Sequence, residues 1–206
     1  VVEQGDQSGC RHVDGADLRA QVASCEKGAQ ELRKMVGQFG LDVVQAYMRH
    51  VQDNAEECVR RAIESLKDAE LTYQMDPDFD GNPRQISVKV TVDRAARSAR
   101  IDFTGTTGQL ATNYNAPEPV TRAAVLYVFR LLVADNIPMN EGVMKPLEVV
   151  LPAGTMLSPQ YPAAVIAGNV ETSQAVTSAL LLALEVQAAA QSTMNNTTWG
   201  DAKYQY

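Results

Sequence analysis

The sequence predicts an α+β fold, with mixed α/β character, in which a helical hairpin is followed by a mixed sheet with packed helices. Apolar residues recur every three or four positions between Asp17 and Leu66, which is typical of amphipathic helices. From Gln85 to Asp93 the spacing changes to strict alternation, and strands and helices then follow one another without a repeat. We expect residues 1–68 to form the helical hairpin segment and 69–206 a mixed α/β segment, truncated at both ends.

Two helices are predicted in the first segment. Asp17 can cap a helix that runs to about Val36, and Gly37 and Gly40 are expected to break it. A second helix follows from about Leu41 to Leu66. Their apolar stripes consist of Leu18, Val22, Cys25, Ala29, Leu32 and Val36 in the first helix, and Val44, Tyr47, Met48, Val51, Ala55, Cys58, Ala62 and Ile63 in the second. The stripes predict an amphipathic hairpin packed on a sheet.

Strands are predicted next. Gln85–Asp93 alternates apolar and polar residues as a half-buried strand does, and Ala99–Phe103 is its expected partner across a turn. Leu71–Tyr73 can add another strand. The loop Asp76–Pro83 carries four Asp and Asn side chains, but it lacks the glutamate that a calcium loop has at position twelve and contains two prolines, so a turn is favoured.

The last third of the chain predicts two helices and a strand. Pro119–Ala134 is strongly helical with an almost continuous apolar surface, which indicates burial on several sides. Leu147–Leu151 is predicted to be a strand because prolines bound it on both sides. A final helix is expected from about Thr172 to Ala190.

Composition excludes several classes of protein. The chain has 206 residues, 45% of them hydrophobic and 21% charged, as ordinary globular domains do. A net charge of -7 and only 6% aromatic residues argue against nucleic-acid binding. No apolar run reaches the roughly 18 residues needed to span a bilayer. The first residues resemble neither an initiator nor a signal peptide, so a piece of a longer protein is expected.

Three cysteines, Cys10, Cys25 and Cys58, are widely spaced and include no C-x-x-C pair. This pattern fits a reducing cytosol, and Cys25 and Cys58 are expected to be core thiols because they fall on the apolar stripes. Cys10, His12 and Asp14 are three possible metal ligands, but no Cys/His cluster completes a zinc site. No metal site is therefore expected.

Three polar stretches are candidates for a binding or catalytic site. Residues 102–108 are rich in Gly and Thr and lead to Asn113 and Asn115; they can cradle an anion with backbone N–H groups or form a tight turn held by side-chain-to-backbone bonds. Residues 191–200 include Asn195 and Asn196, which can line a pocket for an amide-like ligand or end a helix.

The remaining stretch, 167–174, opens the last predicted helix. Asn169 is a suitable cap, and the exposed N–H groups of a helix start suit an anionic group. Glu171 is the only charged residue between Val149 and Leu184. Either Glu171 is a functional carboxylate of a site, or it is solvated and complements the helix dipole. The second half of the chain, in which charged residues are sparse, is expected to be interior or covered by something else.

Six sequence motifs resemble those of a known protein family in their order and spacing. DFTGT, NYNAPEPVTRAAVLY, IPMNEG, LPAGT, PAAVIAGNVETSQ and TMNNTTWG resemble the hydantoinase B/oxoprolinase family, over about Asp17 to Gly200. The helical stretch GLDVVQAYMRHVQDNAE is most similar to the oxoprolinase branch.

The resemblance implies large cytoplasmic enzymes that couple ATP hydrolysis to attack on a lactam, hydantoin or ketone carbonyl. The oxoprolinase branch opens 5-oxo-L-proline to L-glutamate with ATP, Mg and a monovalent cation. A hydantoinase A-like ATP-binding half, fused or separate, phosphorylates the substrate oxygen, and the B-like part handles the activated intermediate. Alternatives are an N-methylhydantoinase subunit, an acetone or acetophenone carboxylase subunit, or a non-catalytic scaffold section. The parent is expected to be a homo-oligomer, and this piece alone to be inactive.

The same resemblance suggests roles for the polar residues. An activated lactam needs amide and hydroxyl donors around the oxyanion and one acid or base nearby. Glu171 is the possible base. The expected substrate-binding residues are Asn113, Asn115, Asn169, Thr172, Ser173, Asn195 and Asn196. The His/Asp metal-binding region of the family lies upstream of the matched motifs, and nothing in this sequence matches it.

Overall fold

The computed structural model describes residues 11–77 and 81–190, with the backbone alone for 11–14. Two compact units divide the chain, Val1–His50 and Val51–Tyr206, so that the second helix belongs to both. The predicted boundary between a helical hairpin segment, 1–68, and a mixed α/β segment, 69–206, stays a prediction. The described elements are α1 (Arg11–Phe39), α2 (Leu41–Glu64), β1 (Ala69–Met75), β2 (Arg84–Asp93), β3 (Ser98–Asp102), α3 (Glu118–Leu132), η2 (Glu141–Met144), β4 (Leu147–Val150), η3 (Ile166–Gly168) and α4 (Thr172–Ala183).

Gly40 is the single residue between α1 and α2. Its φ of 87° lies in the left-handed region that glycine adopts readily, and its N–H donates to the carbonyl of Val36 at 2.9 Å. The break predicted at Gly40 is therefore confirmed. The break predicted at Gly37 is wrong, because a glycine inside a helix costs only about 1 kcal/mol and the flanking residues continue the helix.

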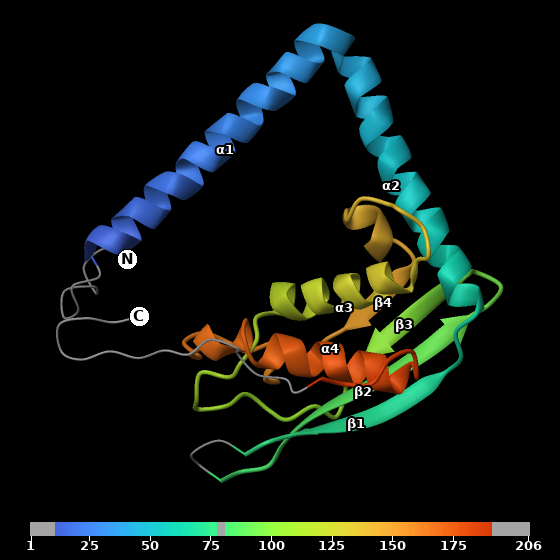
Figure 1. The fold of residues 1–206 in the computed structure, drawn as a ribbon. Helices are drawn as coiled ribbons and strands as arrows, with labels where there is room; N and C mark the ends of the chain where they lie inside the picture. The colour runs from blue at the N-terminus through green and yellow to red at the C-terminus, as the bar shows by residue number, and fades with distance from the viewer. Residues whose placement is uncertain (1–10, 78–80, 191–206) are drawn as a thin grey trace. The chain divides into compact units, whose positions relative to one another are not determined.

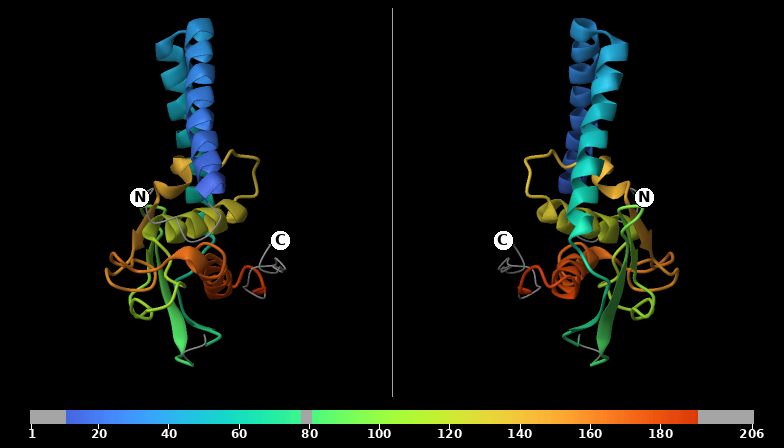
Figure 2. Two further views of the ribbon diagram at one scale, coloured as in Figure 1. Left: turned by 90° about the vertical axis from the view of Figure 1, so that its left-hand side faces the viewer. Right: turned by 90° about the vertical axis from the view of Figure 1, so that its right-hand side faces the viewer.

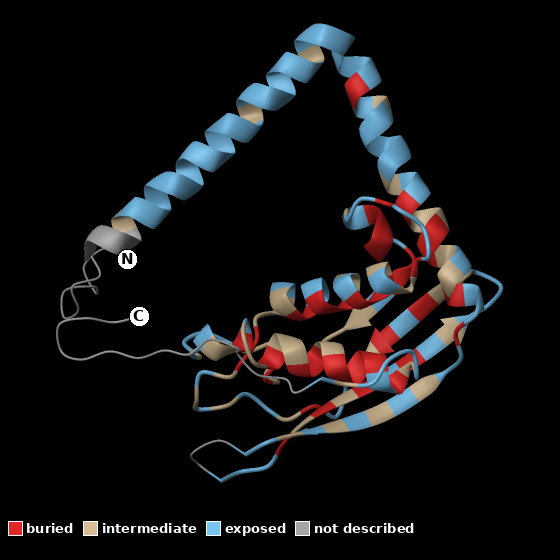
Figure 3. Cartoon of the chain, in the orientation of Figure 1, coloured by how far each residue is buried: buried red, intermediate tan, exposed pale blue. Residues whose placement is uncertain are grey.

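The apolar stripe of α1 is exposed in the first unit. Leu18, Val22 and Leu32 keep about half of their surface accessible, and almost the whole of α1 is coloured as exposed in Figure 3. Cys25 is exposed as well, so the prediction of a core thiol there is wrong. The prediction is confirmed for Cys58, which is buried. The periodicity of α1 was correct, but the large members Leu18, Val22 and Leu32 of its stripe are exposed, while Ala29 and Val36 are half-buried.

A four-stranded mixed sheet in the order β1-β2-β3-β4 forms the second unit. β1 pairs antiparallel with β2, with Tyr73 opposite Ile86, and β2 pairs antiparallel with β3. β3 pairs parallel with β4, with Ile101 opposite Val149. The predicted strands are confirmed within two residues at each end, because the alternation of apolar and polar residues matches the buried and exposed faces. The α+β class is confirmed.

α3 and α4 lie side by side on one face of this sheet (Figures 1 and 2). The core between the layers contains Ile86, Val88 and Val90 from β2, with Phe129 from α3 and Leu180 from α4, all almost fully buried. On the other face of β2, Lys89 and Thr91 are exposed. One face of α3 therefore packs into this core. The predicted burial of α3 on several sides is wrong, because Tyr127 and Leu131 on its other face are about half exposed.

α4 ends at Ala183, seven residues before the predicted end. Glu185 adopts a φ of 56°, and the N–H groups of Glu185 and Val186 donate back to the carbonyls of Leu182 and Leu181. This is the hydrogen-bond pattern of a Schellman cap, which usually has glycine at the left-handed position. Because Glu185 rather than a glycine occupies this position, no residue in the sequence indicates where the helix ends.

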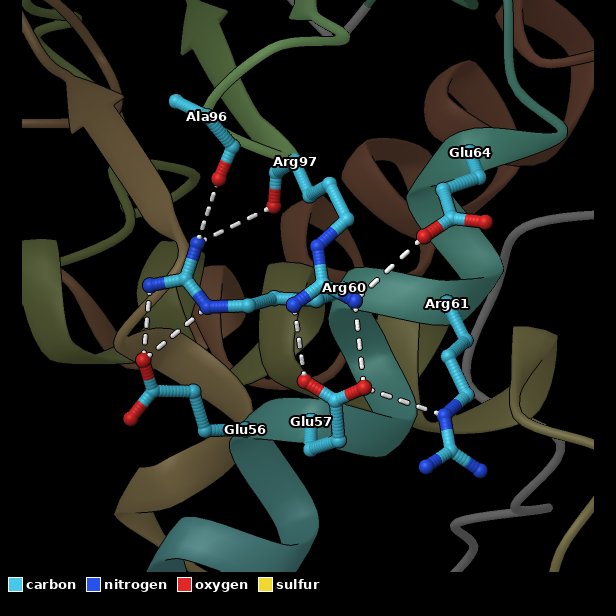
Figure 4. Close-up of polar contacts among 7 residues, drawn as sticks. All are labelled: Glu56, Glu57, Arg60, Arg61, Glu64, Ala96 and Arg97. Atoms are coloured by element: carbon cyan, nitrogen blue, oxygen red, sulfur yellow. Dashed lines mark hydrogen bonds and ion pairs between the residues drawn. The ribbon is translucent and has the colours of Figure 1, made fainter.

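Arg60 and Arg97 attach the last turns of α2 to the turn between β2 and β3 (Figure 4). Arg60 Nη1 donates to the carbonyls of Ala96 at 2.8 Å and Arg97 at 3.2 Å, while its Nη2 meets Glu56 at 2.6 Å. Arg97 donates to Glu57 at 3.0 and 3.1 Å and to Glu64 at 3.3 Å. These charge-assisted bonds join elements that lie far apart in the sequence.

Candidate functional site

Two of the three predicted polar stretches meet where α3 and α4 begin. The N–H of Ala167 donates to the carbonyl of Asn113 at 2.9 Å, and Thr172 Oγ1 donates to the carbonyl of Tyr114 at 2.5 Å. Residues 113–115 and 167–173 therefore lie side by side although more than fifty positions separate them in the sequence. The structure brings together Asn113, Asn115, Asn169, Glu171, Thr172 and Ser173, whereas Asn195 and Asn196 lie outside the described residues.

Asn115 is the buried centre of this arrangement. Its side chain has no exposed surface, and its Oδ1 accepts from the N–H of Leu110 at 2.8 Å. Its Nδ2 lies 3.0 Å from the carbonyls of Leu110 and Thr112 and 2.9 Å from that of Ala164. The two amide hydrogens are thus shared among backbone carbonyls, so in this conformation Asn115 positions the two loops.

The two helix starts have no side-chain cap. Pro117 precedes α3 and Glu171 precedes α4, and neither makes a capping hydrogen bond. The prediction of a cap at Asn169 is wrong, because Asn169 ends the short helix η3 and is exposed. The first N–H groups of each helix therefore have no partner in the side chain of the N-cap residue, and a helix start of this kind favours negative charge.

Glu171, Asn113 and Asn169 are the accessible members of the set. Asn113 and Asn169 are exposed and Glu171 is half-buried, and the Glu171 N–H donates to the carbonyl of Ala167 at 2.8 Å. Ser173 Oγ donates to the carbonyl of Asn169 at 2.7 Å, and the hydroxyl of Thr172 is buried. One carboxylate and two amide side chains thus remain accessible on segments that Asn115 and Thr172 hold together.

The Gly- and Thr-rich stretch after β3 is a tight turn. Thr106 Oγ1 accepts from the N–H of Ser87 at 3.1 Å and Thr107 Oγ1 from that of Gln85 at 2.8 Å. Asp102 accepts from the N–H of Thr104 at 2.8 Å, and hydrogen bonds from Thr104 and Arg100 hold the pKa of Asp102 below its usual value. The alternative of side-chain-to-backbone bonds is confirmed here.

Two features were missed by sequence reasoning. Arg84 is only 2% exposed and its guanidinium carbon lies 4.9 Å from the centre of the Tyr114 ring, a cation–π contact beside the loops. A cavity of about 890 Å³ elsewhere is lined by Arg60, Arg100 and Lys145 among others. Each of these three cations meets a carboxylate, whereas Arg94, which also lines the cavity, donates to the backbone carbonyls of Glu64 and Leu66. Nothing in the local sequence pattern indicates either feature.

Metal ligands and membrane spans were sought in the same part of the chain. Residues 15–77 and 81–190 contain no group of three or more His, Cys, Asp or Glu side chains that could hold a metal ion. No described helix is both long enough and apolar enough to cross a membrane.

The hydantoinase B/oxoprolinase family model matches residues 10–206, which include all of the elements and loops above. The chain belongs to this family. The "5-oxoprolinase 1" of Arabidopsis thaliana is 41% identical over 203 residues, and the "5-oxoprolinase" of Dictyostelium discoideum is 38% identical over 198. Each alignment covers 93% of this chain but only 16% and 15% of those relatives, so the chain spans about a sixth of their length.

Among solved structures, the ATP-dependent caprolactamase from Pseudomonas jessenii has the same fold. The two superpose with a TM-score of 0.71 over 90% of this chain and 31% of that one. At 22% sequence identity the likeness shows the fold alone.

Proposed function

We propose that this chain is a section of an ATP-dependent, cytoplasmic 5-oxoprolinase that opens the lactam ring of 5-oxo-L-proline to give L-glutamate. The observation that supports it best is the similarity to 5-oxoprolinases over almost the whole chain, including both loops of the candidate site. The parent contains a hydantoinase A-like half, fused or separate, that binds ATP with Mg and a monovalent cation.

The proposed chemistry uses the activated lactam. A lactam carbonyl is a poor electrophile, and phosphorylation of its oxygen provides a leaving group before water attacks the carbon. Glu171 takes the proton of the attacking water, while the amides of Asn113 and Asn169 donate to the substrate. The hydroxyl of Ser173, whose hydrogen is donated to the carbonyl of Asn169, accepts from the substrate. Asn115 and Thr172 hold the two loops together. The C–N bond of the resulting tetrahedral intermediate then breaks, and the ring nitrogen takes up a proton and becomes the amine. A second water hydrolyses the remaining acyl phosphate to L-glutamate and inorganic phosphate.

Substitution of Glu171 tests this role. Glu171→Gln in the parent enzyme keeps the shape of the side chain and removes the base, so kcat for ATP-dependent glutamate release should fall by at least about a hundredfold. Asp135→Asn is the matched control, because Asp135 is exposed after the other end of α3. Unchanged turnover in Glu171→Gln would remove Glu171 from the mechanism.

Substrate choice separates the reactions of the family. The parent should release glutamate from 5-oxoproline with ATP, and neither hydrolyse an N-methylhydantoin nor carboxylate acetone at a comparable rate. The isolated 206-residue chain should be inactive with all three. A parent that prefers the hydantoin or the ketone contradicts the proposed substrate but keeps the family.

A further inference from the structure

Arg84 is a buried cation beside the candidate site. It is the first residue of β2 and is only 2% exposed. Moving a charged group out of water is costly, and apolar side chains that fill the same space are often at least as good for stability. Stability alone is therefore a weak reason for an arginine at this position.

The main chain around Arg84 is held on two sides. Arg84 pairs with Met75 of β1, and the next residue, Gln85, donates its N–H to Thr107 Oγ1 at 2.8 Å. The Gln85 carbonyl accepts from the N–H of Thr107 at 3.0 Å. The Arg84 side chain thus extends from a backbone fixed by β1 and by the turn after β3, which is the kind of rigid support that a precise site requires.

The guanidinium of Arg84 contacts the ring of Tyr114. Its Cζ lies 4.9 Å from the ring centre, within the range of a cation–π contact. Tyr114 is half-buried, and such contacts are stronger where water is partly excluded. Arg84 takes part in further interactions as well. The contact with the ring is the one that joins the start of β2 to the loop before α3.

Tyr114 in turn connects both loops of the candidate site. Its carbonyl accepts from Thr172 Oγ1 at 2.5 Å, and Thr172 follows Glu171 directly as the first residue of α4. Asn113 precedes Tyr114 in the chain, and the Asn113 carbonyl accepts from the N–H of Ala167 at 2.9 Å. A displacement of the Tyr114 ring therefore moves the main chain that places both the proposed donor and the proposed base.

We propose that Arg84 is a positioning residue of the candidate site. Through the Tyr114 ring it fixes the loop that carries Asn113, and through the Tyr114 carbonyl it fixes the start of α4 beside Glu171. Arg84 itself does not touch the substrate, because its side chain is almost fully buried. The inference rests on the function proposed above. A misplacement of reacting groups by about 1 Å lowers turnover by up to about a hundredfold, so a contact outside the site has a measurable effect.

Substitutions on both sides of the contact test this role in the parent enzyme. Arg84→Met removes the charge and Tyr114→Leu removes the ring. Each should lower kcat for glutamate release by at least about tenfold and change KM by less than about threefold, since Glu171 acts in the chemical step. Arg84→Lys and Tyr114→Phe retain a cation and a ring, so each should be at least about threefold faster than its partner variant. The double variant should be within about twofold of the slower single one, because both substitutions remove the same contact.

Arg60→Ala separates positioning from stability. Arg60 holds the turn that follows β2, and the 10 residues of that strand place this turn about 30 Å from Arg84. Thermal unfolding gives the stability of every variant, and kcat per folded enzyme is measured well below the lowest midpoint. Arg60→Ala should keep kcat within about twofold. An equal loss of kcat in Arg60→Ala, additive losses in the double variant, or unchanged turnover in Tyr114→Leu overturns the proposal. If Arg84→Met does not fold, Tyr114→Leu compared with Tyr114→Phe gives the same decision.

Failure of the proposed function gives a different result. If the parent prefers a hydantoin or a ketone, the variants are assayed with that substrate, and the same order of rates is expected because Arg84 places the loops whatever the substrate. Loss of turnover in Arg84→Met with unchanged turnover in Glu171→Gln would remove Glu171 from the mechanism and support the positioning of the loop by Arg84.

Discussion

Gly168 lies directly against the main chain of Asn115. A Cβ atom built on Gly168 would stand 2.1 Å from the Asn115 carbonyl oxygen and 2.7 Å from the Ala116 Cα. Both neighbours are backbone atoms, so neither can rotate away. The loop before α3 and the loop before α4 therefore touch at a point that only glycine permits.

Gly168→Ala should destabilise the second unit by about 3 kcal/mol, because the added methyl group forces two backbone segments apart. Gly108→Ala is the matched control, since its Cβ would meet its nearest neighbour at an ordinary 3.9 Å. Thermal unfolding of the chain measures both, and the control should stay within about 1 kcal/mol of the unsubstituted chain. Equal stability of the two variants would show that the loops do not touch at Gly168.

Asn115→Asp should cost about 3 kcal/mol or more, because a buried carboxylate replaces an amide that faces three carbonyl oxygens. A protonated carboxyl can donate one bond again, so the loss should be smaller in acidic than in alkaline buffer. Chemical denaturation at several pH values measures the difference from the unsubstituted chain.

The exposed Asn113 provides the control for that substitution. Asn113→Asp changes the same functional group two residues away, where water solvates the carboxylate, and should shift stability by no more than about 0.5 kcal/mol. A cost at Asn115 that is as small as this one, or that does not depend on pH, would contradict the structural role of the Asn115 amide.

The sheet was predictable because its sequence pattern is local. Ile86, Val88 and Val90 alternate with polar residues, and this pattern fixes both the strand and its buried face. The parallel pairing of β3 with β4 was not predictable, since it depends on contacts between residues about fifty positions apart. The end of α4 was missed for a different reason, because Glu185 occupies a left-handed position without the glycine that usually indicates one.

Sequence reasoning assembled part of the candidate site. Family motifs drew attention to Asn115, Thr172 and Glu171, and the structure places their segments together. The sequence alone could not distinguish asparagines that hold the loops together from asparagines that face solvent, because the side chain has the same donors and acceptors in both settings. The burial of Asn115 and the exposure of Asn169 make that distinction.

Arg60→Ala should destabilise the second unit by about 1–2 kcal/mol, because it removes the donor of two backbone carbonyls and leaves Glu56 with Lys145, at 3.4 Å, as its remaining cationic partner. The neighbouring Arg61→Ala removes only a pair with Glu57, and the Arg61 side chain is 68% exposed. Its effect should stay near about 0.5 kcal/mol. Urea denaturation compares the two, and an equal loss in both would contradict the attachment of α2 through Arg60.

Stability should also fall in acid through the carboxylates that meet these arginines. Hydrogen bonds from Arg60 lower the pKa of Glu56, and those from Arg97 and then Arg61 lower the pKa of Glu57, both from an ordinary value of 4.5. A carboxyl group whose pKa is lower in the folded than in the unfolded state stabilises the fold fully at pH values above its unfolded pKa. That stabilisation is lost as the pH falls through the folded pKa. Both side chains are partly exposed, so added salt should reduce the effect.

The midpoint of thermal unfolding, measured from neutral pH to about pH 3, should therefore fall more steeply in the unsubstituted chain than in an Arg60→Ala/Arg97→Ala variant. Parallel curves would mean that these ion pairs contribute nothing to the acid sensitivity of the fold.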